Sequence, residues 1–139
     1  MSVLLDTNVL SELARPEPEP QVVSYIKKAG GAYLSVITIH ELRHGAELVK
    51  NKHKQKKLLN WLEGICSNYA NHILPISVEI AELAAVLRAQ ASSKGRTLHI
   101  EDALIGATAL SHALALATRN TNDFTITGLR LINPWLKYK

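Results

Sequence analysis

The sequence predicts an α/β fold, a three-layer α/β/α arrangement in which helices cover both faces of a mainly parallel sheet of about five strands. Short apolar runs at residues 3–5 and 114–117 have the composition of strands that are buried on both faces. Longer segments between such runs carry apolar residues at i, i+3 and i+4, the spacing of amphipathic helices. Strands that alternate with helices are typical of parallel sheets.

The elements follow one another with little linker between them. Strands are expected at residues 3–5, 33–36, 73–75, 114–117 and 129–132, and helices at residues 8–14, 21–28, 38–49, 54–69, 78–93 and 100–112. The prolines between residues 16 and 20 separate the first two helices, because proline lacks the N–H that continues a helix. Gly30, Gly31 and Gly95 are expected just beyond helix ends.

Length and composition indicate a single domain over residues 1–139 of a soluble, cytoplasmic protein. Cys66 is the only cysteine, so an internal disulfide is excluded. No stretch approaches the roughly 20 apolar residues that a membrane span needs. The apolar run before Asp6 is too short for a signal peptide, and we expect no membrane partner.

The charge distribution favours a polyanionic partner. The net charge is +4, and residues 50–57 hold five lysines and no acid. This run either follows the phosphates of a nucleic acid or forms a solvated helix face. The candidate nucleic-acid contacts are Arg43, Lys54, Lys57 and Arg88.

Four acids stand at or near the predicted carboxyl ends of strands. Asp6 directly follows the first strand, and Asp123 lies shortly after the strand at 114–117. Glu41 is in the helix entered from the second strand, and Asp102 is near the start of the helix at 100–112. Parallel strands place their carboxyl ends at one edge of the sheet, so we expect the four side chains to converge there.

Clustered carboxylates repel one another and raise each other's pKa unless a cation is present. Mg²⁺ prefers such hard oxygen ligands, and one or two divalent ions can activate water against a phosphodiester. Each acid also has a structural interpretation. Asp6, with Thr7 and Asn8, can cap a helix, and Asp102 suits a helix start. Glu41 can be a surface charge and Asp123 a turn residue, so the prediction depends on the set.

A competing motif overlaps this set. His40, Glu41 and His44 match the zinc-protease pattern H-E-x-x-H, with Glu63 as a conceivable third ligand. A small zinc protease is therefore an alternative function. It is disfavoured because the chain is short for a two-lobed protease and because the other three acids would have no role.

Several blocks resemble PIN-domain ribonucleases. These are residues 4–12, 35–45, 102–109 and 116–124, in the family's order, and Asn133-Pro134-Trp135 is similar to the FitB-like branch of VapC-type toxins. The resemblance implies a toxin of a type II toxin–antitoxin pair, an endoribonuclease that uses Mg²⁺ or Mn²⁺. It also implies a homodimer, a small DNA-binding antitoxin as partner, and a higher toxin–antitoxin assembly on DNA.

By motif match, Asp6, Glu41 and Asp102 are implied to be catalytic metal ligands. The fourth position falls at Asn120 or Asp123, of which we favour Asp123. The expected supporting polar residues are Thr7, Asn8, Thr118 and Asn120. A PIN module that has lost catalysis and only binds an antitoxin on DNA remains an alternative. A response-regulator receiver is disfavoured, because Ser77 rather than an acid follows the strand at 73–75.

Overall fold

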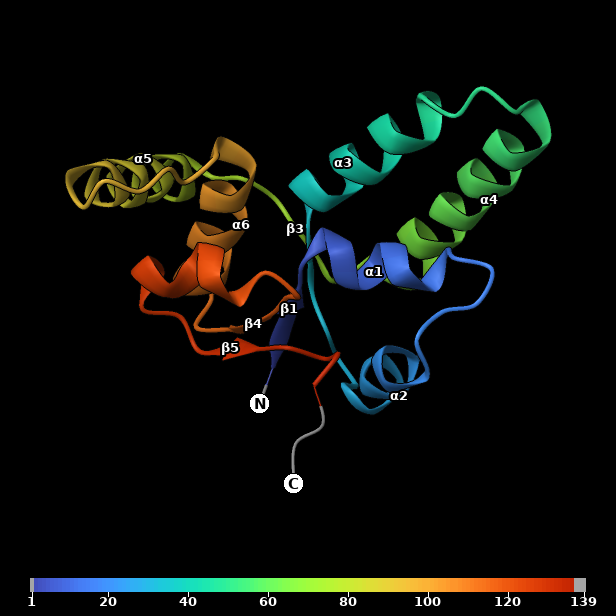
Figure 1. Ribbon diagram of the computed structural model, residues 1–139, viewed down its shortest axis with the longest axis horizontal. Helices are drawn as coiled ribbons and strands as arrows, with labels where there is room; N and C mark the ends of the chain where they lie inside the picture. The colour runs from blue at the N-terminus through green and yellow to red at the C-terminus, as the bar shows by residue number, and fades with distance from the viewer. Residues whose placement is uncertain (1, 137–139) are drawn as a thin grey trace.

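Five parallel strands form the centre of the molecule (Figure 1). The computed structural model describes residues 2–136. The strands are β1 (Val3–Leu5), β2 (Leu34–Ser35), β3 (Ile73–Leu74), β4 (Ala115–Ala117) and β5 (Leu131–Ile132). Strands β1, β4 and β5 pair in that order, and β2 pairs with β3. A parallel bridge between Leu4 and Tyr33 joins the two groups, giving the order β3-β2-β1-β4-β5.

The six predicted helices are all present, with ends that differ from the prediction by at most two residues. They are α1 (Thr7–Leu13), α2 (Pro20–Lys28), α3 (Val36–Glu47), α4 (Lys52–Asn68), α5 (Val78–Ser93) and α6 (Ile100–Ser111). The assignment of Val36 to a strand was wrong. The Oγ of Ser35 accepts a hydrogen bond from the N–H of Ile37 at 3.0 Å, so Ser35 caps α3 and the helix begins at Val36.

A short 3₁₀ helix, η1 (Thr121–Thr127), follows β4 where no helix was expected. Two of its side chains, Phe124 and Thr127, are buried. A segment of seven residues is too short for a helical pattern to stand out in the sequence. The terminal strand is also shorter than the prediction, since pairing with β4 extends only over Leu131 and Ile132.

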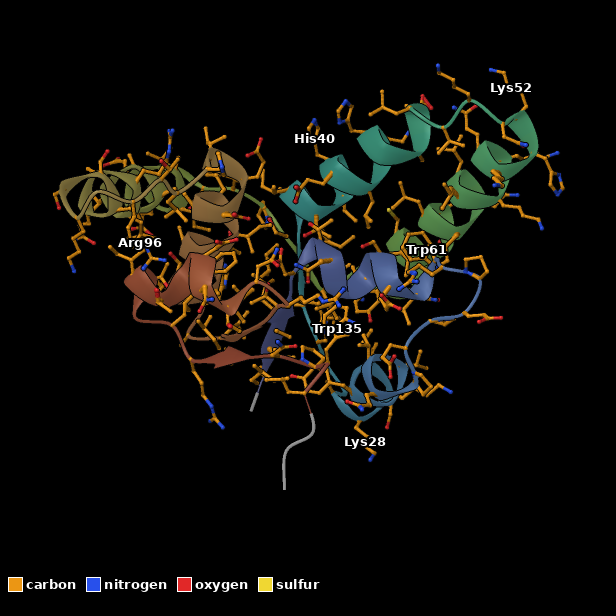
Figure 2. All side chains as sticks on the ribbon, viewed as in Figure 1. Lys28, His40, Lys52, Trp61, Arg96 and Trp135 are labelled. Atoms are coloured by element: carbon orange, nitrogen blue, oxygen red, sulfur yellow. The ribbon has the colours of Figure 1, made fainter. Side chains whose placement is uncertain are left out.

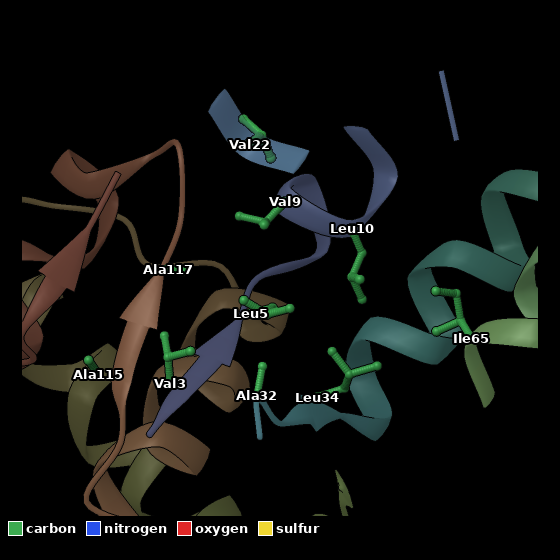
Figure 3. Packing of buried hydrophobic residues seen from close by; sticks show 10 residues of the cluster. All are labelled: Val3, Leu5, Val9, Leu10, Val22, Ala32, Leu34, Ile65, Ala115 and Ala117. Carbon is green, nitrogen blue, oxygen red and sulfur yellow. The ribbon is translucent and has the colours of Figure 1, made fainter. Parts of the chain in front are cut away.

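Alternate residues of β1 enter different cores, which creates the three layers. Val3 and Leu5 face α1 and α2, where they pack in one cluster with Val9, Leu10 and Val22 (Figure 3). Ala115 and Ala117 of β4 belong to the same cluster. Small side chains at those positions let the helices approach the sheet closely.

The opposite face of the sheet is covered by α6 and η1. Leu4 and Leu116 pack against Ile105 and Ala109 of α6 and against Phe124. Helix α5 then packs on α6 through a further apolar cluster. The predicted α/β/α layering with a parallel sheet is confirmed.

Helices α3 and α4 form a hairpin that projects beyond the sheet (Figure 1). Asn51 caps α4, because its Oδ1 accepts a hydrogen bond from the N–H of Lys54 at 3.0 Å. Among residues 2–136, no helix has both the length and the apolar character needed to cross a membrane.

Candidate active site

The sheet register places Asp6 and Thr118 side by side. Leu5 of β1 is opposite Ala117 of β4, so the residues that follow them leave the sheet together. The backbone N–H of Asp6 donates to the carbonyl of Ala117 at 2.9 Å. The position of the first predicted acid is therefore fixed by strand pairing between the two ends of the chain.

The Asp6 carboxylate is buried, with 4% of the residue exposed, and accepts three hydrogen bonds. The N–H of Thr7 donates to Oδ1 at 2.8 Å. The Thr118 hydroxyl donates to Oδ2 at 2.7 Å, and the Asn8 amide donates to the same oxygen at 3.2 Å. Asp6 thus occupies the N-cap of α1, and its side chain is held by three predicted polar neighbours.

Burial raises the pKa of Asp6 above its ordinary value, and the charge of Glu41 raises it further. The hydrogen bonds from Thr118, Thr7 and Asn8 act in the opposite direction, since they favour the charged form. The carboxylate is therefore fixed in position while its charge is only partly compensated.

Glu41 is held at the same edge by α1. The Thr7 hydroxyl donates to Oε1 of Glu41 at 2.6 Å and lies 3.1 Å from the hydroxyl oxygen of Thr38. The side chain of Thr7 therefore links α3 to the first turn of α1, while its backbone N–H holds Asp6. One residue orients two of the predicted acids.

The pKa of Asp102 is affected by the charges of all three other acids. The pKa of its carboxyl is raised to about 6, first by burial and then by the charges of Asp6, Asp123 and Glu41, with a smaller opposing effect of His99. Since charge interactions weaken with distance, this coupling shows that the four side chains share one neighbourhood. The charges of the other three acids therefore reach Asp102, while their assembly into one ion-binding site stays a prediction.

The loop after β4 distinguishes Asp123 from Asn120. The backbone N–H of Asn120 donates to the Thr118 hydroxyl at 3.1 Å, and its carbonyl accepts from the N–H of Asp123 at 3.0 Å. Asn120 thus stands at the N-cap of η1, and Asp123 lies in the first turn. Both side chains are exposed, and the charge of Asp123 acts on Asp102.

The four acids do not form a closed cage. Within residues 2–136, no three Asp, Glu, His or Cys side chains are close enough together to enclose an ion. An open arrangement still fits Mg²⁺ or Mn²⁺, because the donor set consists of hard oxygens and Mg²⁺ usually keeps several waters. The residues present therefore fit a divalent ion that is only partly coordinated by protein.

The zinc-protease interpretation gains no support from this geometry. The exposed rings of His40 and His44 stack with centroids 6.1 Å apart, and the part of the chain that the structure describes gives them no third ligand. Glu41 instead accepts a hydrogen bond from Thr7 and acts on Asp6 and Asp102.

Comparison with known proteins identifies the fold family. The family described as PIN domain matches residues 3–127. The chain belongs to the PIN-domain family. Toxin FitB of Neisseria gonorrhoeae is 39% identical over 136 residues, covering 96% of this chain and 98% of the relative. The VapC ribonuclease Y4jK of Sinorhizobium fredii is 38% identical, covering 96% and 97%.

A solved structure agrees with these sequence relationships. The structure of FitAB bound to an IR36 DNA fragment superposes on this PIN domain with a TM-score of 0.91 at 36% identity, covering 99% of this chain and 98% of that chain. The resemblance to VapC-type toxins of the FitB-like branch is thereby confirmed.

Two of the four predicted basic contacts of this PIN domain are engaged within the protein. Arg43 pairs with Glu47 at 3.7 Å on the surface of α3. The Nε of Arg88 donates to the carbonyl of Leu98 at 3.1 Å and fastens the segment between α5 and α6. Lys54 and Lys57 are exposed on α4.

Arg96 is a supporting residue that the sequence did not indicate. Its guanidinium donates to the carbonyl of Asn122 at 2.6 Å and to the hydroxyl of Thr125 at 2.7 Å. Arg96 thus connects the segment before α6 to η1. Helix α6 carries Asp102, and η1 carries Asp123. No motif surrounds Arg96, so only the three-dimensional contact reveals it.

Thr118→Val should destabilise this PIN domain by about 1–3 kcal/mol, because a fully buried donor to Asp6 and an acceptor for Asn120 are removed. The pKa of Asp6 should rise further, since Thr118 favours its charged form. Urea denaturation of the metal-free protein measures the first effect. Thr118→Ser keeps the hydroxyl and should restore most of the stability, and equal stability of Thr118→Val and wild type would contradict the prediction.

Arg96→Ala should weaken divalent-ion affinity about tenfold, the lower end of the range for residues that support a metal site. The reason is that η1 loses its two guanidinium contacts and no longer fixes Asp123. Titration with Mn²⁺ measures the effect. Arg88→Ala is the matched control, because Arg88 bonds to Leu98 rather than to η1. Unchanged Mn²⁺ affinity in Arg96→Ala would contradict a positioning role.

Proposed function

We propose that this protein is the toxin of a type II toxin–antitoxin pair, an endoribonuclease that hydrolyses RNA phosphodiester bonds with Mg²⁺ or Mn²⁺. The observation that carries the proposal is the hydrogen-bonded arrangement of Asp6, Thr7 and Glu41 at the carboxyl ends of the PIN-domain strands. The pKa of Asp102, raised by burial and then by the charges of Asp6, Asp123 and Glu41, supports it. Two similar proteins, the VapC ribonuclease Y4jK of Sinorhizobium fredii and the ribonuclease VapC1 of Rickettsia felis, support nuclease activity.

Asp6, Glu41, Asp102 and Asp123 are the residues that would hold the divalent ions. A bound divalent ion supplies Lewis-acid activation of water and neutralises charge on the phosphate. Four ionised carboxylates alone would repel an RNA phosphate, so the acids fit a phosphodiesterase only together with such a cation.

The chain's own polar residues orient this set. Thr118 and Asn8 fix Oδ2 of Asp6, and Thr7 fixes both Asp6 and Glu41. Carboxylates held in this way need little rearrangement when substrate arrives, which lowers the reorganisation that accompanies the reaction. Asn120 does not contact Asp6 in these hydrogen bonds, but its backbone N–H donates to the Thr118 hydroxyl and so helps to orient Thr118.

The proposal extends to partners and location. A small DNA-binding antitoxin would inhibit the toxin, and homodimers would join a larger assembly on DNA in the cytoplasm. The support comes from similar solved structures described as FitAB bound to an IR36 DNA fragment and as DNA-bound VapBC from Salmonella typhimurium, the latter 26% identical with a TM-score of 0.83.

Incubation of the pure protein with single-stranded RNA tests the activity. Cleavage is expected with Mg²⁺ or Mn²⁺, EDTA should abolish it, and the Asp6→Asn substitution should lower its rate about 100-fold or more. Cleavage that survives both would refute the proposed mechanism by implicating a different site or a contaminant. Calorimetry that detects no divalent-ion binding, together with absent cleavage, would instead favour a silent module that only binds its antitoxin.

A further inference from the structure

The Asn-Pro-Trp segment, residues 133–135, forms a tight turn directly after β5. The Oδ1 of Asn133 accepts a hydrogen bond from the N–H of Trp135 at 2.9 Å, and its carbonyl accepts one from the N–H of Leu136 at 3.1 Å. Proline suits the second position of such a turn, because its fixed φ matches that position. Pro134 is buried, so the turn is anchored against the body of the protein.

This turn places the ring of Trp135 against the residue that follows Thr118. The guanidinium carbon of Arg119 lies 4.9 Å from the centre of the Trp135 ring, within the range of a cation–π contact. The side-chain amide of Asn133 also donates to the carbonyl of Arg119 at 3.5 Å. Trp135 packs against the apolar cluster that α1 and α2 form on the sheet (Figure 2). The C-terminal segment therefore holds Arg119 through both its side chain and its backbone.

Arg119 in turn contacts the residues that hold Asp6. Its N–H donates to Oδ1 of Asn8 at 3.2 Å. The Nδ2 of Asn8 donates to Oδ2 of Asp6 at 3.2 Å and to the hydroxyl of Thr118 at 3.4 Å. A continuous series of contacts thus extends from Trp135 through Arg119 and Asn8 to the Asp6 carboxylate.

We propose that Trp135 and Arg119 are positioning residues of the candidate active site. They hold the turn after β4 so that Asn8 and Thr118 keep the Asp6 carboxylate in the orientation that a divalent ion requires. The inference rests on the proposed function, because it treats Asp6 as an ion ligand. It gives the Asn-Pro-Trp segment a role at a site that begins near the other end of the sequence.

The turn after β4 needs such a contact because strand pairing ends there. The N–H of Thr118 still donates to the carbonyl of Ile132. The N–H groups of Arg119 and Asn120 donate to side chains instead, and a side-chain acceptor can rotate away. Within the part of the chain that the structure describes, no carboxylate forms an ion pair with Arg119. The indole ring is therefore the group that fixes the guanidinium.

Hydrogen exchange of the metal-free protein tests this contact without any catalysis. Arg119→Met keeps the aliphatic stem of an exposed side chain and removes the cation. The protection factors of the amides at positions 119 and 120 should fall about fivefold, which corresponds to loss of one exposed cation–π contact. The amide of Leu116, which donates to the carbonyl of Arg130 inside the sheet, should keep its protection. Equal loss at all three amides would indicate general destabilisation and contradict the proposal.

Mn²⁺ titration tests whether the contact acts on the acid site. Arg119→Met and Trp135→Leu should each weaken Mn²⁺ binding about fivefold. The double variant should bind Mn²⁺ no more weakly than either single variant, because both substitutions remove the same contact.

Trp61→Leu is the matched control for loss of a tryptophan. Trp61 is also half-buried against the same apolar cluster, but it lies on α4, away from the turn after β4 (Figure 2). Trp61→Leu should lose stability and keep its Mn²⁺ affinity. An equal loss of Mn²⁺ affinity in Trp61→Leu and Trp135→Leu would show that Trp135 acts only through general stability.

Steady-state kinetics separates positioning from direct RNA binding. Arg119→Met should lower kcat and leave KM for RNA unchanged, because Arg119 acts through Asp6. Arg119→Lys should recover part of the rate, since an ammonium group can also lie over the ring. A raised KM with unchanged kcat, and a salt slope reduced by about 0.7, would mean that Arg119 contacts a phosphate. That result would overturn the positioning role.

The proposal is also contradicted if Arg119→Met changes neither Mn²⁺ affinity nor the protection of the turn amides. Failure of the wild type to cleave RNA would instead contradict the proposed function, and the exchange and Mn²⁺ experiments would still decide whether this contact orders the ion site. A wild type that binds no Mn²⁺ would contradict both.

Discussion

Asp6→Asn should lower the rate of RNA cleavage about 100-fold or more without unfolding the protein, because losing one preorganised charge at a reacting centre typically costs that much. Asparagine has nearly the same shape, and its amide oxygen can still accept the hydrogen bond from the N–H of Thr7. The substitution removes the negative charge that a divalent ion would need. Cleavage of a labelled single-stranded RNA under single-turnover conditions measures the rate.

The metal-free form of Asp6→Asn should also be more stable than the wild type. The pKa of Asp6 is raised in the folded protein, so its charged form opposes folding at neutral pH, and a neutral amide removes that cost. Reduced activity with increased stability is a combination that a general folding defect does not produce. Thermal melting in EDTA measures the stability.

Glu12→Gln provides the matched control on the same helix. Glu12 is also buried, but its carboxylate accepts hydrogen bonds from the N–H of Glu19 at 2.9 Å and from Arg15 at 3.1 Å, away from the acid cluster. The Glu19 N–H, followed by Arg15, lowers the pKa of Glu12, so its charge favours the folded state. Glu12→Gln should therefore lose stability and keep its cleavage rate. Equal losses of activity in both variants would show that Asp6 acts only through the fold.

The metal-free protein should carry an electrostatic cost at Asp102 that disappears on acidification. The pKa of Asp102 is about 6 in the folded state, against 3.8 for an ordinary aspartate. The folded state therefore binds more protons than the unfolded state between about pH 4 and 6. The contribution of Asp102 to stability consequently falls as the pH rises through this window and is most unfavourable above pH 6.

Asp102→Asn removes this cost, so the gain in melting temperature over the wild type should be largest at pH 7 and should fall to about a third of that value at pH 4.5. A shift of about two pKa units corresponds to at most about 3 kcal/mol, and partial exposure of Asp102 reduces this to about 1–2 kcal/mol. The expected gain at pH 7 is several degrees. Thermal melting in EDTA across this pH range measures it.

Mg²⁺ should reverse the order of the two proteins. At pH 7.5, a concentration of 100 times the dissociation constant stabilises the folded state by about 2.7 kcal/mol. The wild type should gain this stability, whereas Asp102→Asn should gain much less. A gain from Asp102→Asn that does not change with pH, or equal Mg²⁺ responses, would contradict the assignment of Asp102 to an ion-binding cluster.

The sequence predicted helices correctly where the apolar pattern is local, and it predicted the position of a residue correctly where that residue directly follows a strand. The i, i+3, i+4 spacing gave α5 at residues 78–93 without error, because one face of that helix packs on α6. Asp6 could be placed because it directly follows a buried strand whose neighbours are parallel. Its cap interpretation is confirmed by the hydrogen bond from the Thr7 N–H, and its role as a metal ligand stays a prediction.

The remaining features depend on contacts between distant segments. Val36 has a side chain suited to a strand, but the hydroxyl of Ser35 begins a helix there. Asn120 and Asp123 could not be separated by composition, because their roles depend on the turn of η1. Arg96 supports that turn from 26 residues away, and no spacing rule relates it to Asn122.

The pairing of β1 with β4 also determines when the four acids can come together during synthesis of the chain. Asp6 leaves the ribosome more than a hundred residues before its partner Thr118 and before the fourth acid, Asp123. A nascent chain that ends before β4 has neither the neighbouring strand nor the complete acid set. The order of these segments thus delays assembly of the acid set until β4 and η1 have been synthesised.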